Sequence, residues 1–210
     1  EYTKDTRVPK RGEAGMITRS AIFGYKPRSP LRQNFCSATS MAMKSPREHK
    51  VIAEFAKNLN ELYEKYFPET YLYHKEKVKQ VKDEWIIDGS VFTSGIINKN
   101  NPLKYHHDSG NFKGVLSNMI AFKSDVGGGR LVMPEYNIKL EIADNTVSIF
   151  DGQSIVHGVT PIVKNTKDAY RYTIVYYSLE QMWKCDTIKE EILRIRKLKK
   201  EKEFKRLQTE

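Results

Sequence analysis

The 210-residue sequence holds only two cysteines, Cys36 and Cys185, and it has no long hydrophobic run. With only two cysteines so far apart, we expect no disulfide framework and a reducing, intracellular compartment. That compartment would be the host cytoplasm for a viral protein or the nucleus for a eukaryotic one. No apolar run approaches the roughly 18 residues of a membrane span and no signal-peptide pattern opens the sequence, so we expect no membrane partner. The length suits a single domain with a real core, which we expect to be a monomer.

Acidic residues are also in deficit, because 36 Lys and Arg face 26 Asp and Glu, for a net charge of +10. The excess lies at the two ends: residues 1–34 hold eight basic against three acidic residues, and residues 188–206 hold nine against four. Basic ends around a near-neutral middle suit a polyanion such as nucleic acid. A solubilising surface is the alternative.

What the sequence does contain is the motif His106-His107-Asp108, with His157 further along the chain. In an extended segment, residues two apart point to the same side, so His106 and Asp108 can converge on one ion while His107 points away. With His157 they supply two imidazoles and one carboxylate, the ligand set that holds non-haem Fe(II) and leaves positions open for a co-substrate and dioxygen. Taken alone, the motif also fits a polar loop.

Short β-rich segments separated by turn residues follow the triplet Gly127-Gly128-Gly129. They cover residues 130–133, 138–142, 146–150, 154–157, 160–163 and 170–178. Regularly spaced short strands favour a β-sandwich or barrel over a doubly wound sheet, and we expect a jelly roll. Its open mouth would gather the metal motif, His157 and an inward-pointing arginine.

That arginine is Arg171, which opens the last of these strands and shares one face with Thr173, Val175 and Tyr177. A guanidinium among apolar and aromatic neighbours on an inward face needs an anion, because burying an unpaired charge is costly. The distal carboxylate of 2-oxoglutarate would be such an anion. A charge on a surface strand is the alternative.

Helices are expected on both sides of this strand region. Ser45-Pro46-Arg47-Glu48 predicts a capping box with proline at the first helical position, and apolar residues recur at helical spacing from Val51 until Pro68. We expect this helix to pack on the outer face of the larger sheet, with a short helix over residues 71–81 and a strand over residues 91–98. His49 and His74 are expected to face solvent.

The C-terminal segment predicts a basic helix with an apolar stripe. The stripe consists of Ile188, Ile192, Ile195 and Leu198. We expect it to dock onto the barrel, with the outer face of the helix available to lie along DNA.

Four segments resemble the double-stranded β-helix core of Fe(II)/2-oxoglutarate-dependent dioxygenases, over roughly residues 90–180. They are residues 127–136, 147–152, 156–162 and 171–175. A narrower resemblance lies in residues 106–111, which are similar to the H-x-D-x-x-N signature of the TET/J-binding-protein group. That group oxidises the methyl group of 5-methylcytosine or thymine in DNA.

The resemblance implies an α+β fold, with a double-stranded β-helix (jelly-roll) core flanked by N-terminal helices and a basic C-terminal helix. We expect one dioxygenase domain over residues 1–210. It would comprise a basic N-terminal segment (1–44), a helical region (45–84), the jelly-roll core (85–180) and the basic C-terminal helix (186–208).

Carried over by position, the resemblance makes His106, Asp108 and His157 the catalytic iron ligands. Arg171 would pair with 2-oxoglutarate, and Thr173 would help to hold this co-substrate. Asn111 would hydrogen-bond the Watson–Crick edge of a flipped base, and Tyr177 would border the base pocket.

The sequence departs from the family in two places, and the first leaves the base identity in doubt. Leu179 stands near the position where some 5-methylcytosine oxidases carry a base-contacting histidine. The sequence also lacks the long insert and the cysteine-rich zinc module of the animal members, which indicates a minimal viral or microbial type.

Further DNA contacts are expected from the N-terminal arginines. Arg19, Arg28 and Arg32 alternate with aromatic residues, a combination that can contact phosphates and stack on an unpaired base. Alternatively, one of these arginines lines the 2-oxoglutarate pocket. Tyr105 and Phe112 flank the metal motif and are candidates either for stacking on the base or for core packing.

The expected function is therefore hydroxylation of the 5-methyl group of a flipped pyrimidine in DNA, using Fe(II), 2-oxoglutarate and O2. We slightly favour 5-methylcytosine over thymine. A prolyl- or lysyl-type protein hydroxylase on the same fold is the first alternative, and a non-enzymatic DNA-binding module is the second.

Overall fold

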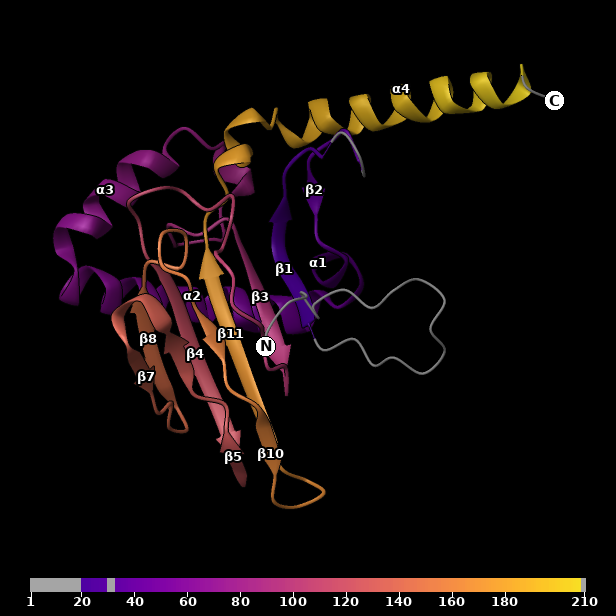
Figure 1. Cartoon of the computed structure of the whole chain (residues 1–210). Coiled ribbons are helices and arrows are strands. Elements are labelled where there is room, and N and C mark those ends of the chain that lie inside the picture. The colour runs from indigo at the N-terminus through magenta and orange to yellow at the C-terminus, as the bar shows by residue number, and fades with distance from the viewer. Residues whose placement is uncertain (1–19, 30–32, 209–210) are drawn as a thin grey trace.

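A six-stranded antiparallel sheet forms the centre of the computed structural model, which describes residues 20–29 and 33–208 (Figure 1). In spatial order its strands are β2 (Ser37–Ala38), β1 (Ser20–Lys26), β3 (Ser94–Lys99), β11 (Tyr170–Tyr177), β4 (Ser117–Ser124) and β8 (Thr146–Phe150). Two smaller sheets complete the strand region. They pair β10 (Ile162–Lys164) with β5 (Val126–Gly128), and β6 (Leu131–Met133) with both β7 (Ile138–Leu140) and β9 (Gly158–Val159).

Alternation along β11 divides the interior into two cores. Ile174 and Tyr176 pack into a cluster with the helices, whereas Val175 and Tyr177 pack into a second cluster with Leu131 of β6. Successive residues of a strand point to opposite faces, so one strand serves both clusters. The face of β11 that carries Val175 and Tyr177 is covered by the smaller sheets. The candidate functional site described below lies on this face.

Helices cover the other face of the six-stranded sheet, where α2 crosses behind the strands in Figure 1. They are α1 (Ser40–Lys44), α2 (Pro46–Tyr66) and α3 (Pro68–Val78). The expected helix and its place on the larger sheet are confirmed, since Leu59 and Tyr63 of α2 are fully buried in this cluster. The expected capping box is wrong, because the Ser45 side chain makes no capping hydrogen bond.

The expectation that His49 and His74 face solvent is also wrong. His74 on α3 is 0% exposed, and its Nε2 lies 2.9 Å from Oγ of Ser178. Its ring packs edge-on against Phe92 and Phe112, because α3 turns this side toward the sheet. His49 is half-buried, and its Nε2 accepts a hydrogen bond from the backbone N–H of Gly24.

The expectation from the cysteine content needs correction, because Cys36 and Cys185 form a disulfide. The two residues are 149 positions apart, so no local sequence pattern predicts this contact. The fold brings the segment just before β2 against the end of the short 3-10 helix Glu180–Lys184. The bond removes the argument from cysteine content for a reducing compartment.

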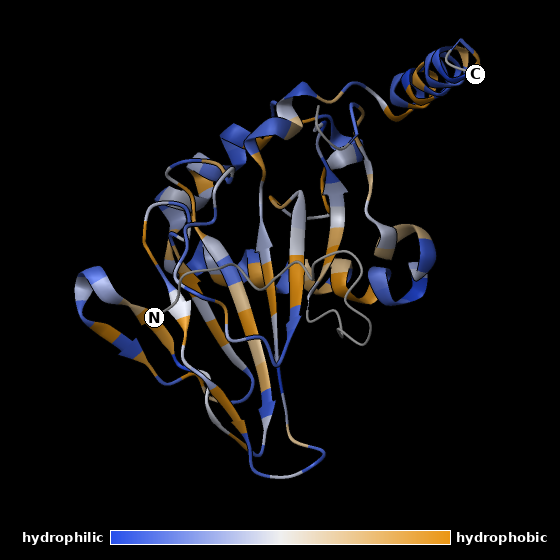
Figure 2. Ribbon diagram, turned by 45° about the vertical axis from the view of Figure 1, so that its right-hand side comes forward, coloured by the Kyte–Doolittle hydropathy of each residue, from blue (hydrophilic) through white to orange (hydrophobic). Residues whose placement is uncertain are grey.

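The C-terminal helix α4 (Ile188–Leu207) projects from the body instead of docking along it (Figure 1). The apolar stripe does not dock as expected: Ile188 and Ile192 are 40% and 44% exposed, and polar contacts hold the first turn. Most of α4 is hydrophilic in Figure 2. Among the described residues, no helix is long and apolar enough to cross a bilayer.

The expected strands after the glycine triplet are confirmed with one exception. Residues 154–157 are not a strand, because Oδ1 of Asp151 accepts hydrogen bonds from the backbone N–H groups of Gln153 and Ser154 and closes a turn there. The strand β9 begins only at Gly158. This turn places His157 at the entrance to β9, next to the loop that carries the metal motif.

Candidate active site

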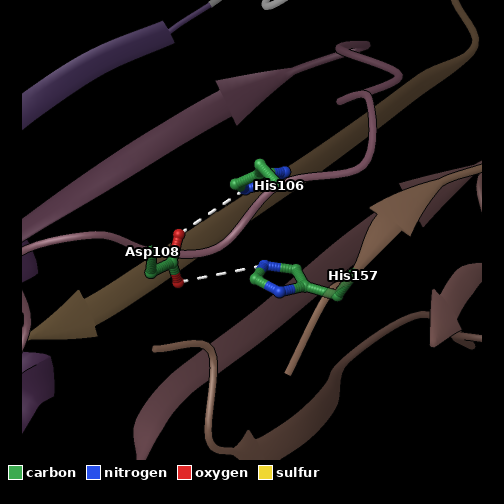
Figure 3. Close-up of side chains that lie close together, drawn as sticks. All are labelled: His106, Asp108 and His157. Carbon is green, nitrogen blue, oxygen red and sulfur yellow. Dashed lines mark ion pairs between the residues drawn. The ribbon is translucent and has the colours of Figure 1, made fainter. Parts of the chain in front are cut away.

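His106, Asp108 and His157 converge as the spacing of the motif predicts (Figure 3). One ligand atom from each residue lies within 4.8 Å of the other two. Oδ1 of Asp108 is 3.5 Å from Nε2 of His106, and its Oδ2 is 3.9 Å from Nε2 of His157. Each carboxylate oxygen thus faces one imidazole, an arrangement that can hold a metal ion on one side.

Backbone hydrogen bonds fix these three residues relative to one another. The backbone N–H of His106 donates to the carbonyl of His157 at 2.9 Å, and the reverse bond is 3.0 Å long. The backbone N–H of Asp108 donates to the carbonyl of Gly152 at 2.8 Å. His107 is exposed, as the alternation of an extended segment predicts.

Both histidines are oriented by their second ring nitrogen. Nδ1 of His106 lies 2.6 Å from the carbonyl oxygen of Lys104, and Nδ1 of His157 lies 2.9 Å from that of Ile155. A carbonyl only accepts, so each Nδ1 carries the proton and each Nε2 presents its lone pair to the site. Burial lowers the pKa of His157, which favours the neutral form that binds a metal.

A pocket opens beside these residues, between β11 and the smaller sheets. Apolar side chains of Leu131, Phe150 and Val159 form much of its wall. The polar groups in the wall belong to Asn98, Asn101, Arg171, Thr173, Tyr177 and the three converging residues. A largely apolar pocket with a few polar groups is typical of a small-molecule site.

Arg171 lies in this pocket wall and is only 2% exposed. Within the described part of the chain, its Nε and Nη2 atoms have no hydrogen-bond partner, and burial lowers its pKa to about 10. A β-carbon on Gly129, which has a φ of +68°, would lie 2.7 Å from Cδ of Arg171. Gly129 therefore leaves room for the Arg171 side chain, whose unpaired guanidinium donors require an anionic ligand.

A chain of hydrogen bonds leads to Thr173 from three residues that were not predicted from the sequence. Nδ2 of Asn101 donates to Oγ of Ser20 at 3.0 Å, and Ser20 donates to Oδ1 of Asn98 at 2.6 Å. Nδ2 of Asn98 lies 3.5 Å from Oγ1 of Thr173, at the limit of a hydrogen bond. Thr173 accepts in this chain, so its own proton can point at a ligand in the pocket. Only the alternation around Ile96–Asn98 could have signalled Asn98.

The structure separates the predicted substrate-binding residues. Tyr177 lines the pocket, and Thr173 lies four residues before it on the same face of β11. Asn111 is buried outside the pocket wall, with its Nδ2 donating to Oγ of Ser117 at 3.2 Å. Arg28 instead pairs with Asp186 and Glu191 at the start of α4. Arg19 and Arg32 lie outside the described residues.

The two aromatic candidates for base stacking also differ. Phe112 is fully buried in the helix-side core, where its ring centroid lies 5.0 Å from that of Trp183, so its stacking role is excluded. Tyr105 is largely exposed, next to the backbone of Gly158.

These residues fit Fe(II) and 2-oxoglutarate on chemical grounds. The two Nε2 atoms and the Asp108 carboxylate form the donor set of a non-haem Fe(II) site. The unpaired Arg171 guanidinium in the same pocket matches one carboxylate of a dicarboxylate, and the Thr173 hydroxyl lies on the same face.

Comparisons with known proteins give the family. NgTET1, solved in complex with 5mC DNA, is similar to this chain with a TM-score of 0.64 and 18% identity, over 87% of this chain and 70% of that chain. RemF, a polyketide cyclase from Streptomyces resistomycificus, reaches a TM-score of only 0.23 at 12% identity, over 40% of this chain and 51% of its own, which supports no argument. No curated protein sequence matches. A family model described as the oxygenase domain of the 2OGFeDO superfamily matches residues 23–180, so the chain belongs to the TET/J-binding-protein family of Fe(II)/2-oxoglutarate-dependent dioxygenases.

Proposed function

We propose that this dioxygenase hydroxylates the 5-methyl group of a pyrimidine flipped out of DNA, with 5-methylcytosine slightly favoured over thymine. The observation that carries the oxygenase chemistry is the unpaired, buried Arg171 in the same pocket as the His106, Asp108 and His157 cluster. The family and the 5mC DNA in the NgTET1 complex support DNA as the substrate class. Action on DNA would place the enzyme inside a cell.

Each group of the site has a part in this reaction. The Nε2 atoms of His106 and His157 and the carboxylate of Asp108 would hold Fe(II), and Arg171 would hold 2-oxoglutarate. The bound iron, with 2-oxoglutarate and O2, supplies the oxidising power that breaks a methyl C–H bond. The apolar wall excludes water, and the fixed side chains hold the co-substrate in one orientation.

The base must leave the duplex stack to reach this pocket, at a cost of a few kcal/mol. Tyr177, which lines the pocket, would border the base. Asn111, which the resemblance assigns to the Watson–Crick edge of the base, is buried outside the pocket wall, and one N–H of its amide donates to Ser117. An asparagine amide offers both a donor and an acceptor and can pair with either base, so the preference rests on the 5mC DNA of the NgTET1 complex.

The test is an incubation of the protein with Fe(II), 2-oxoglutarate and duplex DNA, followed by mass spectrometry of the nucleosides. One duplex contains 5-methylcytosine and the other only unmodified bases, including thymine. We expect 5-hydroxymethylcytosine from the first duplex. The Asp108→Ala protein is the control, and it should give no product because the only carboxylate of the cluster is gone.

A protein hydroxylase would share the same iron and 2-oxoglutarate residues, so the site alone does not separate the two functions. Succinate release that rises with a prolyl or lysyl peptide, together with no oxidised pyrimidine, would replace the DNA proposal by this alternative. Product from the Asp108→Ala protein would instead remove the metal site. The non-enzymatic alternative does not fit a member of an oxygenase family that retains the whole ligand set.

A further inference from the structure

A buried carboxylate lies at the point where helix α4 joins the body. Glu191, in its first turn, is 1% exposed. It accepts hydrogen bonds from Nε of Arg28 at 3.0 Å, from the backbone N–H of Cys36 at 2.9 Å and from that of Asp186 at 3.1 Å. Because a buried charge without partners is very costly, such complete pairing fixes Glu191, and with it the start of the helix.

Two further contacts complete this attachment, which we call the α4 clamp and define by Arg28, Cys36, Cys185 and Glu191. The disulfide between Cys36 and Cys185 joins the segment before β2 to the residues that lead into α4. One turn further on, Nε of Arg194 donates to the carbonyl of Asn34 at 2.6 Å. The clamp therefore sets the direction in which α4 leaves the body.

Beyond the clamp, α4 extends without packing against the body (Figure 1). Leu198 is the last half-buried residue, and every residue from Lys199 to Gln208 is exposed. Core packing therefore does not explain the outer part of the helix. A fixed direction combined with an unpacked helix indicates a surface that is presented to a partner.

The side of α4 opposite the clamp presents three basic residues, with the exposed Leu193 and Leu207 beside them. Lys189, Arg196 and Lys200 are all exposed, and their spacing of seven and four residues places them on one face of a helix, away from Glu191. Over residues 188–206, nine basic residues outnumber four acidic ones. A helix of 20 residues is about 30 Å long, so this basic face can follow several phosphates of a duplex.

We propose that α4 is a rigid arm that binds the phosphate backbone of duplex DNA through Lys189, Arg196 and Lys200. The proposal rests on the proposed function, because DNA is the polyanion that the catalytic pocket would act on. The arm adds affinity without reading sequence, since lysine and arginine contacts to phosphates carry no base information. The clamp holds the arm in one orientation relative to the pocket.

The test measures binding of a fluorescent duplex of about 20 base pairs without methylated cytosine, by anisotropy across a salt series. The arm variant carries Lys189→Gln, Arg196→Gln and Lys200→Gln. Each lost phosphate contact lowers the slope of log K against log salt by about 0.9, so we expect a decrease of about 2 to 3. Affinity at moderate salt should fall at least about tenfold.

A matched control removes the same charge from α2, through Arg47→Gln, Lys50→Gln and Lys57→Gln, which are exposed positions on the helix layer. This control should bind nearly as the wild type does. Equal losses in the two variants would show an effect of net charge and would overturn the arm. An unchanged arm variant would also overturn it, including the case where the arm binds anionic vesicles or an acidic protein instead.

The clamp supplies a second, independent variant. Cys36→Ser with Cys185→Ser keeps every basic residue of α4, and we expect it to weaken duplex binding several-fold because the direction of the arm is no longer fixed. Wild-type affinity in this variant would overturn the role of the clamp. The proposed function fails separately: arm-dependent DNA binding without any oxidised nucleoside would leave the arm intact and remove the DNA oxidation.

Discussion

A β-carbon on Gly152 would lie 2.4 Å from Oδ2 of Asp108. Such a contact is too short for unbonded carbon and oxygen atoms, so only glycine at this position allows the carboxylate to face both histidines. The carbonyl of the same glycine accepts the backbone N–H of Asp108 at 2.8 Å. Gly152 therefore holds the backbone of Asp108 and leaves space for its side chain.

We predict that Gly152→Ala displaces the Asp108 carboxylate and lowers Fe(II) affinity by about 10- to 100-fold, the range expected when the support of a metal ligand is lost. Titration of the apo-protein with Fe(II) under anaerobic conditions measures this. Gly127→Ala is the matched control, since its β-carbon would meet Cβ of Val163 at an ordinary 3.9 Å. Equal Fe(II) affinity in the two variants would contradict the role given to Gly152.

Arg171 should affect stability and binding in opposite directions. Its unpaired Nε and Nη2 make the ligand-free pocket costly, so we predict that Arg171→Met raises the free energy of unfolding by about 1 kcal/mol or more. The same change should lower 2-oxoglutarate affinity at least about 30-fold, because the carboxylate loses its charged partner. Urea unfolding and calorimetric titration with an oxygen-inert metal measure the two effects.

Arg130→Met is the control for this pair of measurements, because Arg130 is exposed and pairs with Glu141 on the surface. It should leave 2-oxoglutarate affinity unchanged. A destabilised Arg171→Met protein would mean that the guanidinium has a structural partner after all.

The hydroxyl of Thr173 is predicted to donate to the co-substrate, because Asn98 occupies its acceptor side. Thr173→Val keeps the shape but removes the proton, and we expect it to lower 2-oxoglutarate affinity about tenfold or more, as for a hydrogen bond to a charged group. Thr173→Ser should restore most of the affinity. If the Thr173→Val and Thr173→Ser proteins bind 2-oxoglutarate with equal affinity, the hydrogen-bond chain from Asn101 does not reach the ligand.

The candidate metal site was the part of this molecule most open to prediction from sequence. Local rules predict these residues. Alternation in an extended segment places His106 and Asp108 on one side, and alternation in β11 turns Arg171 and Thr173 toward the same pocket. These rules need only neighbouring residues. Gly152 and Gly129 act through the space that they leave, which a sequence pattern does not express.

Contacts between distant segments were not predictable in this way. The disulfide joins residues 149 positions apart, and Arg28 is held by Glu191 at the start of α4. A segment in which arginines alternate with aromatic residues has the same composition whether its arginines bind a phosphate or a buried carboxylate. Likewise, His74 looked solvent-exposed among charged neighbours on α3, because only the packing of the helix decides which side is buried.

The buried His74 makes stability dependent on pH. Burial lowers its pKa from 6.5 to about 3, so the folded state does not take up a proton between these values whereas the unfolded state does. The contribution of neutral His74 to the free energy of unfolding is therefore fully present above pH 6.5, the pKa of the histidine in the unfolded state. This contribution is lost progressively as the pH falls below that value. We predict a loss of about 2 kcal/mol between about pH 7.5 and pH 5 from this residue.

His74→Gln, which keeps a donor toward Ser178, should lower stability at neutral pH but remove this part of the pH dependence in urea unfolding. His107→Gln, at an exposed position, should keep the slope of the wild type. If the His74→Gln protein shows the wild-type slope, another group is responsible for the acid sensitivity.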